Sequence, residues 1–232
     1  MRIFYIAKRV FKDEKGVLLL FLILFLLPLM FAILVPGRLI KNLAVLFLAI
    51  PILLYPIFFF IRGIWIIGKE WQRGTVYIYK TNPVSAFEYE TGYILYAAFE
   101  ILFFIALPIV FIFYLSHGFK TLLEFTPSWG TFFVYFPLFL LSYLFGRFLF
   151  LFSRSIYRYR NVLTFLVGIV MFTVFLRIYM SVSHLIPAPF KLTFVTDSVH
   201  VSHIGSFAFV YALLWVLPIF SLNLFLWTRA ES

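Results

Sequence analysis

Six long apolar runs constrain this chain more than any other feature of its sequence. They cover residues 17–35, 43–67, 91–115, 129–152, 162–182 and 204–227. An α-helix needs about 20 apolar residues to cross the ~30 Å hydrocarbon core of a bilayer, and every run is close to or above that length. Backbone polar groups in lipid must be satisfied within the same segment, which favours helices. The expected fold class is therefore an all-α integral membrane protein with six transmembrane helices.

The composition also indicates lipid as the main solvent. Hydrophobic residues make up 64% of the 232 residues and charged residues only 12%, which is too little polar surface for a globule in water. Tyr and Trp, which favour the headgroup level of a membrane, number 14 and 5. No segment outside the runs is long enough for a soluble catalytic domain. Residues 1–232 are therefore expected to form a single transmembrane domain.

Lys and Arg are distributed unequally between the segments that join the runs. If the N-terminus is cytoplasmic, the inner side holds thirteen of these cations, with Arg62 of the second run counted among them, and the outer segments hold four; Arg147 and Arg177 also lie within runs and are not counted. The inner cations are Arg2, Lys8, Arg9, Lys12, Lys15, Arg62, Lys69, Arg73, Lys80, Arg154, Arg158, Arg160 and Arg229. Because cytoplasmic segments carry the cation excess in membrane proteins, we expect a multi-pass protein of the cell membrane with both termini in the cytoplasm.

This orientation signal also accounts for the net charge of +10, since the cations are scattered between apolar runs and do not form one basic patch. No nucleic-acid partner is expected. The chain has no Cys, which excludes disulfides, thiolate metal sites and cysteine catalysis.

The first fifteen residues predict a helix of their own. Ile3, Ile6, Ala7, Val10 and Phe11 recur at helical spacing, with cations on the other side. This pattern favours a basic helix lying at the membrane interface, and a solvated basic tail is the alternative. No A-x-A cleavage site follows the first run, so that run is read as a retained helix, bent at its proline, Pro28.

The segment Gly63 to Lys69 has the spacing G-x-x-x-x-G-K of a phosphate-binding loop. Glu70 follows where a Ser or Thr hydroxyl should hold magnesium, and the four residues between the glycines are bulky and apolar. A carboxylate beside a phosphate repels it. We interpret the segment as a continuing apolar helix and expect no nucleotide to bind there.

The inner segment 68–85 is the most informative part of the sequence, and it predicts a helix, a turn and a second helix. Asn82 can cap the second helix with Pro83 at its first position, and Ser85 with Glu88 offers an overlapping capping box. A short polar helix between two membrane helices is suited to receive force from a partner. A plain solvated connection is the alternative.

The same segment resembles a known family. Glu70, Gly74-Thr75 and Pro83-Val84-Ser85 resemble the E-x-x-x-G-T, followed eight residues later by P-V-S, of permeases of the type-2 ATP-binding cassette (ABC) exporters. The wider layout is similar as well, with an N-terminal interfacial helix, six spans and a cytoplasmic coupling helix between spans two and three. The strictly motif-like part covers about sixteen residues, and the layout covers nearly the whole chain.

The resemblance implies roles and partners. Glu70, Arg73, Gly74 and Thr75 would lie on or beside a coupling helix that docks into a separate ATPase subunit, and 83–85 would begin the connection to span three. ATP and magnesium would be bound by an ABC ATPase dimer, with no cofactor in this chain. A second permease copy, identical or related, would complete the pathway. The expected function is a membrane-spanning exporter subunit, not an enzyme, that moves an amphipathic or hydrophobic cargo such as a peptide, antibiotic or lipid.

Glu100 is the one acidic residue deep inside a run, about 14 Å from its inner end. A charge at mid-helix costs about 2.5–3.5 kcal/mol on insertion scales, so it usually faces a partner or a wet cavity. Arg147, near the inner end of the fourth run, is the candidate partner. A packing role and a transport-path role both stay open for this pair. Arg177, in the outer half of the fifth run, is expected to extend to the surface or to line a pathway.

The outer segment between the last two runs contains four residues of metal-ligating type. They are His184, Asp197, His200 and His203. Although H-x-x-H with an acid could ligate zinc or copper, the Pro- and Ser-containing segment predicts no firm helix to fix the geometry, so ordinary solvated side chains are preferred and no metal is expected.

Two other classes of function compete with the exporter subunit. A proton-coupled carrier that titrates Glu100, or a membrane assembly factor, would need no ATPase partner. An intramembrane enzyme would need a catalytic set, and no Ser/His/Asp grouping or carboxylate pair of that kind is apparent.

Overall fold

The structure is a computed structural model, and it describes most of the chain. The described residues are 2–35, 37–74, 84–117, 127–156, 160–183, 194–196, 199–201 and 206–229. Their helices are α1 (Arg2–Leu34), α2 (Arg38–Gln72), α4 (Ala86–His117), α6 (Pro127–Ser155), α7 (Arg160–Ser183) and α8 (Ser206–Arg229). Each apolar run falls within one helix, apart from one or two residues at the ends of the first and last runs. The helical fold class is thus confirmed in its main part.

One small element departs from an all-α chain. Strands β1 (Phe194–Thr196) and β2 (Val199–Val201) form an antiparallel pair between α7 and α8, with Phe194 opposite Val201. Alternation of Val, Thr and Phe suits a short two-stranded ribbon.

Four stretches of the described residues are long and apolar enough to cross a membrane. They are Arg2–Leu34, Ala86–Pro108, Phe136–Ser155 and Tyr211–Arg229, and Val162–Phe175 in α7 is a shorter apolar stretch. The second half of α2 carries Arg62, Lys69 and Glu70, which lowers its hydropathy. A membrane protein fits these helices, and four is the number of crossings that they support by length and composition.

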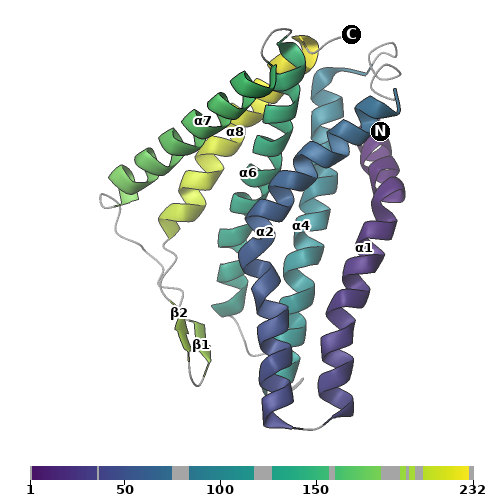
Figure 1. Cartoon of the computed structure of the whole chain (residues 1–232), viewed down its shortest axis with the longest axis vertical. Helices are drawn as coiled ribbons and strands as arrows, with labels where there is room; N and C mark the ends of the chain where they lie inside the picture. Colours follow the sequence, from purple (N-terminus) through teal and green to yellow (C-terminus); the bar gives the residue numbers. More distant parts are fainter. Residues whose placement is uncertain are drawn as a thin grey trace.

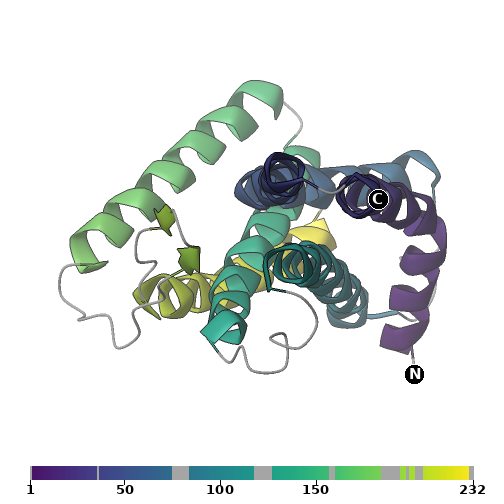
Figure 2. The same ribbon diagram turned by 90° about the horizontal axis from the view of Figure 1, so that it is seen from below.

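The helices form an elongated bundle with α7 angled away from it (Figure 1). Both termini lie at one end, which we name the terminal end, and the β1–β2 ribbon lies towards the other (Figure 1). At the terminal end the last turns of α2 lean across the bundle towards α1 (Figure 1). Figure 2, which looks along the bundle, shows the first turns of α1 running across it while the rest of α1 is seen nearly end-on.

The predicted interfacial helix 1–15 is not a separate element. Residues 2–15 are the beginning of α1, which continues without interruption through Pro28. Ile6 and Val10 are buried, and a Cβ placed on Gly92 of α4 would lie only 2.8 Å from the Ile6 side chain. The apolar spacing of this region therefore reflects, at these two positions, packing against α4. The outward face keeps Phe4 and Tyr5, which are about 70% exposed.

Two glycines bring α2 and α6 into direct contact. A Cβ on Gly63 would collide with the backbone carbonyl of Tyr143, and one on Gly146 would collide with that of Phe60. Small residues at a helix crossing let backbones approach this closely, as is common between membrane helices. The crossing fixes how α2 and α6 are rotated about their axes.

Aromatic rings fill the space further from the terminal end. The Phe59 and Phe139 rings stack with centroids 5.6 Å apart, and Tyr55 meets Phe104 edge to face at 5.9 Å. The Tyr55 hydroxyl donates a hydrogen bond of 3.0 Å to the Phe104 carbonyl oxygen. This cluster joins α2, α4 and α6 without any charge.

Candidate functional site

Five polar side chains from α1, α2 and α4 meet inside the bundle, and we name them the ionic network. They are Glu14, Arg62, Lys69, Tyr96 and Glu100. Glu14, Arg62 and Glu100 are at most 6% exposed, so water contributes little to their solvation. Two carboxylates face two cations, so the network carries no net formal charge. A buried charge is tolerated when it is paired and hydrogen-bonded in this way.

Arg62 is the centre of the ionic network. Its Nε and Nη2 donate to Glu100 Oε1 at 2.9 and 2.7 Å, and Nη2 also reaches Tyr96 Oη at 3.1 Å. Its Nη1 donates to Glu14 Oε2 at 2.9 Å. Lys69, two turns further along α2, donates from Nζ to Glu14 Oε1 at 2.6 Å. One guanidinium group thereby connects α1, α2 and α4.

A second buried pair joins α4 to α6. Arg147 donates from Nε and Nη2 to the two oxygens of Glu90 at 3.0 and 2.7 Å, and both residues are fully buried. The guanidinium carbon also lies 4.3 Å from the centre of the Tyr93 ring, with Tyr143 at 6.0 Å. Two parallel charge-assisted bonds and a facing ring hold the charge in place of water.

The predicted pairing of Glu100 with Arg147 is wrong. Glu100 binds Arg62, and Arg147 binds Glu90, which lies about 15 Å nearer the start of α4. The prediction failed because Arg62 lies inside the second run, within reach of Glu100, and because Glu90 directly precedes the third run and is buried against α6. The third candidate, Arg177, is exposed on α7 and takes no part in either cluster.

Spacing along two helices could have revealed the contact between Arg62 and Glu100. Arg62 and Lys69 are seven residues apart, on one face of α2. Glu90, Tyr93 and Glu100 follow one another at intervals of three and seven on α4, so they also share a face. When one helix carries cations on a single face and another carries carboxylates on a single face, a buried ionic contact between the two helices is expected.

The motif segment 68–85 begins inside α2. Glu70 is in the last turn of α2 and is 6% exposed, with Arg9 of α1 at 4.0 Å. Arg73 caps the helix, and its guanidinium lies 3.7 Å from Asp13. Gly74 has a φ of 70°, and its amide donates to the Trp71 carbonyl. The glycine thus ends α2 in a left-handed conformation, which other residues adopt only at a cost.

Thr75, Pro83 and the residues between them, including Asn82, lie outside the described residues, so no separate coupling helix is tested beyond the end of α2. The far side of the segment is described again from Val84, which is half-buried against the core.

The capping box at Ser85 and Glu88 is confirmed. The Ser85 amide donates to Glu88 Oε2 at 3.0 Å, and the Glu88 amide donates to Ser85 Oγ at 3.1 Å. α4 accordingly begins at Ala86. These reciprocal bonds satisfy two backbone donors that a helix start leaves unpaired.

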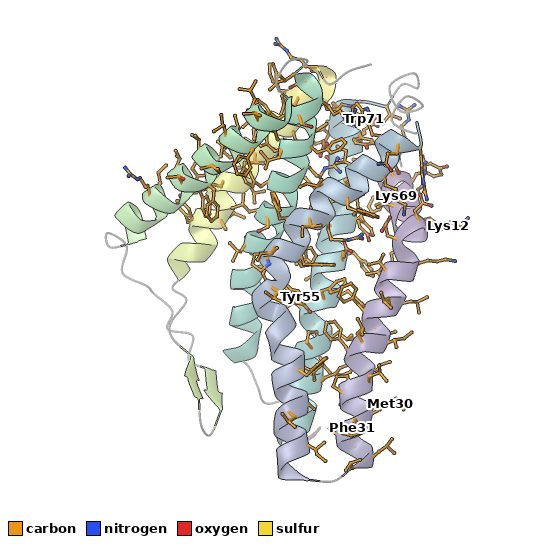
Figure 3. The ribbon with its side chains drawn as sticks, viewed as in Figure 1. Lys12, Met30, Phe31, Tyr55, Lys69 and Trp71 are labelled. Carbon is orange, nitrogen blue, oxygen red and sulfur yellow. The ribbon has the colours of Figure 1, made fainter. Side chains whose placement is uncertain are left out.

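Both sides of segment 68–85 are attached to the first turns of α1. On the α2 side the contacts are Lys69 with Glu14, Glu70 with Arg9 and Arg73 with Asp13. On the α4 side Glu88 lies 3.9 Å from Arg2. Figure 3 shows Lys69 and Trp71 near the terminal end, Tyr55 midway along α2, and Met30 and Phe31 near the opposite end. The motif segment is thus joined to a charged end of the bundle.

The G-x-x-x-x-G-K segment is helical throughout, as expected. It lies within α2, where Gly63 meets α6, Gly68 lies against the Phe150 ring and Lys69 binds Glu14. Its amides are part of a helix and form no phosphate-binding loop.

An apolar groove lies on the other side of α2 and α6, where α7 is angled away. Its volume is about 820 Å³, and α8 contributes Trp215 and Ile219 to its wall. Ligand sites in proteins commonly have this volume.

The suggested metal ligands are not brought together by the described residues. His200 is in β2, whereas His184, Asp197 and His203 lie outside the described part of the chain. Among the residues that the structure describes, no group of three or more His, Asp or Glu side chains could hold a metal ion.

Comparisons of the chain with protein-family models, with curated proteins and with solved structures find no match.

Proposed function

We propose that this chain is the membrane subunit of an ABC exporter, moving an amphipathic or hydrophobic cargo outward with energy from a separate ATPase. The observation that carries the proposal is the double attachment of segment 68–85: ion pairs tie both of its sides to α1. The segment resembles the coupling motif in sequence, and its described sides continue directly into α2 and α4. All six helices would cross the membrane, with both termini and the segment in the cytoplasm.

The ionic network supplies a path for force in this proposal. A push on segment 68–85 reaches Lys69 and Glu70, and through Glu14 and Arg62 it reaches α1 and α4 together. Removing one partner from a buried ion pair costs about 3–5 kcal/mol. Movement of the three helices as one body is therefore favoured over their separation. Differential binding of the ATPase to two orientations of this body would shift the population between inward- and outward-open states.

The first test asks which side of the membrane the segment occupies. Because the chain has no Cys, a single cysteine gives an unambiguous label. Gln72 is exposed at the end of α2, so Gln72→Cys is the test variant. Val35 is exposed at the opposite end of the bundle, and Val35→Cys is the matched control. A membrane-impermeant maleimide added to intact cells should label Val35→Cys and spare Gln72→Cys. Labelling of Gln72→Cys from outside would overturn the proposal.

The second test looks for the ATPase itself. A photo-crosslinking amino acid at position 72 should capture an ATP-hydrolysing protein in cell membranes, while the same group at position 35 should capture none. Export should stop in Gly74 or Glu70 variants and on ATP depletion. Transport that survives ATP depletion, collapses with the proton gradient and is lost in Glu100→Gln would instead establish the proton-coupled carrier.

A further inference from the structure

The groove between α2, α6 and α7 has an almost wholly apolar wall. Ile64, Phe145, Leu149, Phe165 and Phe172 line it. Two of its hydroxyl groups are already used within α6, where Ser142 Oγ donates to Leu138 O and Ser153 Oγ donates to Phe150 O, both at 2.9 Å. A third hydroxyl, Thr164 Oγ1, is buried in the wall and has no hydrogen-bond partner within the described residues. A hydrocarbon occupant still suits the wall better than a polar one, because elsewhere along it a polar group would lose its hydration without new hydrogen bonds.

Arg154 directly follows Ser153, the groove-lining residue of α6 nearest the terminal end. The Arg154 guanidinium carbon is 5.4 Å from the centre of the Phe150 ring, which lines the groove, and 5.8 Å from the Trp71 ring. Within the described part of the chain, Arg154 forms no ion pair, unlike Arg62 and Arg147. Its charge is therefore available to an anion positioned at the end of the apolar wall.

The groove is also long and open enough for a lipid tail. On α6 its lining extends from Leu138 to Ser153, which corresponds to about 22 Å of helix. This exceeds the ~15 Å that one leaflet contributes to the hydrocarbon core. Phe165 and Phe172 line the groove yet are 68% and 57% exposed, so a chain can enter from the surrounding bilayer between them.

We infer that this groove binds one anionic phospholipid, with an acyl chain along α6 and the phosphate on Arg154. Among the described residues, Arg154 places a positive charge next to a wall that is almost wholly apolar, which matches an amphiphile with one anionic end. This binding goes beyond the proposed export function and does not depend on it, because it needs neither ATP nor a partner chain.

The experiment is native mass spectrometry of the full-length chain in mild detergent. The protein is titrated with phosphatidylglycerol or with phosphatidylcholine of the same acyl chains. We expect phosphatidylglycerol to saturate at one molecule per chain with an affinity about tenfold above that of phosphatidylcholine, because the choline ammonium offsets the phosphate charge beside Arg154 and phosphatidylglycerol carries no such cation.

Two variants test the headgroup contact and the acyl-chain contact of the lipid separately. Arg154→Gln should lower phosphatidylglycerol affinity about tenfold, to the level of phosphatidylcholine. Gly168→Leu, whose new side chain enters the groove beside the flexible end of Leu149, should weaken both lipids. The matched control is Arg229→Gln, which removes a last-turn cation that lies 4.5 Å from the Phe225 ring of α8, outside the groove lining, and should change neither affinity.

Three results would overturn the inference. Equal affinity for the two lipids, or an unchanged preference in Arg154→Gln with the melting temperature of the parent protein, would remove the anionic site. A chain dimer that carries no lipid and exposes no groove would show that a second copy covers this face instead.

Discussion

α2 and α6 each have two unlike sides, and the contrast shows how one helix pair can be rigid on one face and compliant on the other. Towards α1 and α4 the contacts are buried ion pairs such as Arg62 with Glu100, both at most 6% exposed. Towards α7 they are apolar groove walls, where Phe165 remains 68% exposed. Charge-assisted bonds need one geometry, whereas apolar contacts tolerate many. The ionic side therefore fixes helix positions, and the α7 side allows displacement at little cost.

The largest expected effect comes from breaking the ionic side. Arg147→Ala leaves Glu90 buried without its partner, so the free energy of unfolding should fall by about 3–5 kcal/mol. Thermal or denaturant unfolding in detergent measures the loss.

The matched variant is the double substitution Arg147→Met with Glu90→Gln, which removes both charges. It should recover a large part of the loss, because no buried charge stays uncompensated. A double variant as unstable as Arg147→Ala would contradict this account.

The next effect tests the contact that the two sides share. Gly63→Ala forces a Cβ into the Tyr143 carbonyl, so α2 and α6 must separate, with a loss of about 1–3 kcal/mol. Gly16→Ala on α1 is the control, since nothing lies within 4 Å of its new Cβ. Better helix propensity should make that control neutral or more stable by up to about 1 kcal/mol. Equal losses in the two variants would mean that the crossing is not close-packed.

A smaller effect is expected at the start of α4, at the edge of the ionic side. Ser85→Ala removes the hydroxyl oxygen that accepts from the Glu88 amide, at a cost of about 1 kcal/mol. Ser221→Ala is the control, because that hydroxyl only donates back to Leu217 within α8. Unfolding monitored by circular dichroism should separate the two variants, and indistinguishable curves would argue against the cap.

The smallest effect is expected on the compliant side. Phe165→Ala should change stability by less than about 0.5 kcal/mol, since the side chain is 68% exposed and loses few contacts when it is truncated. The buried counterpart Phe104→Ala, at 0% exposure, should lose about 3–5 kcal/mol in the same assay. A large loss in Phe165→Ala would show that α7 is held as firmly as α4.

The helices and the start of α4 were open to prediction because their causes are local. Run length determines where an apolar helix extends, and the Ser85–Glu88 bonds join residues three positions apart. The pairing of Glu100 was not open to prediction in the same way. Its partner Arg62 is 38 residues away in the sequence, and Arg147 was an equally available cation. The conformation of Gly74 at the end of α2 follows from its residue type, but the contacts of the neighbouring Glu70 and Arg73 with α1 could not have been predicted.

By itself, the sequence determined that this chain is helical and apolar enough for a membrane, since those properties follow from composition and from hydrogen bonds closed within each segment. Only the tertiary structure decided that the Arg62 guanidinium binds both Glu100 and Glu14, which is 48 residues away in the sequence. The same holds for the pair of Arg147 with Glu90, 57 residues away. The physical reason is rotation: a helix offers several faces, and the close crossing of Gly63 and Gly146 selects which of them turn inward.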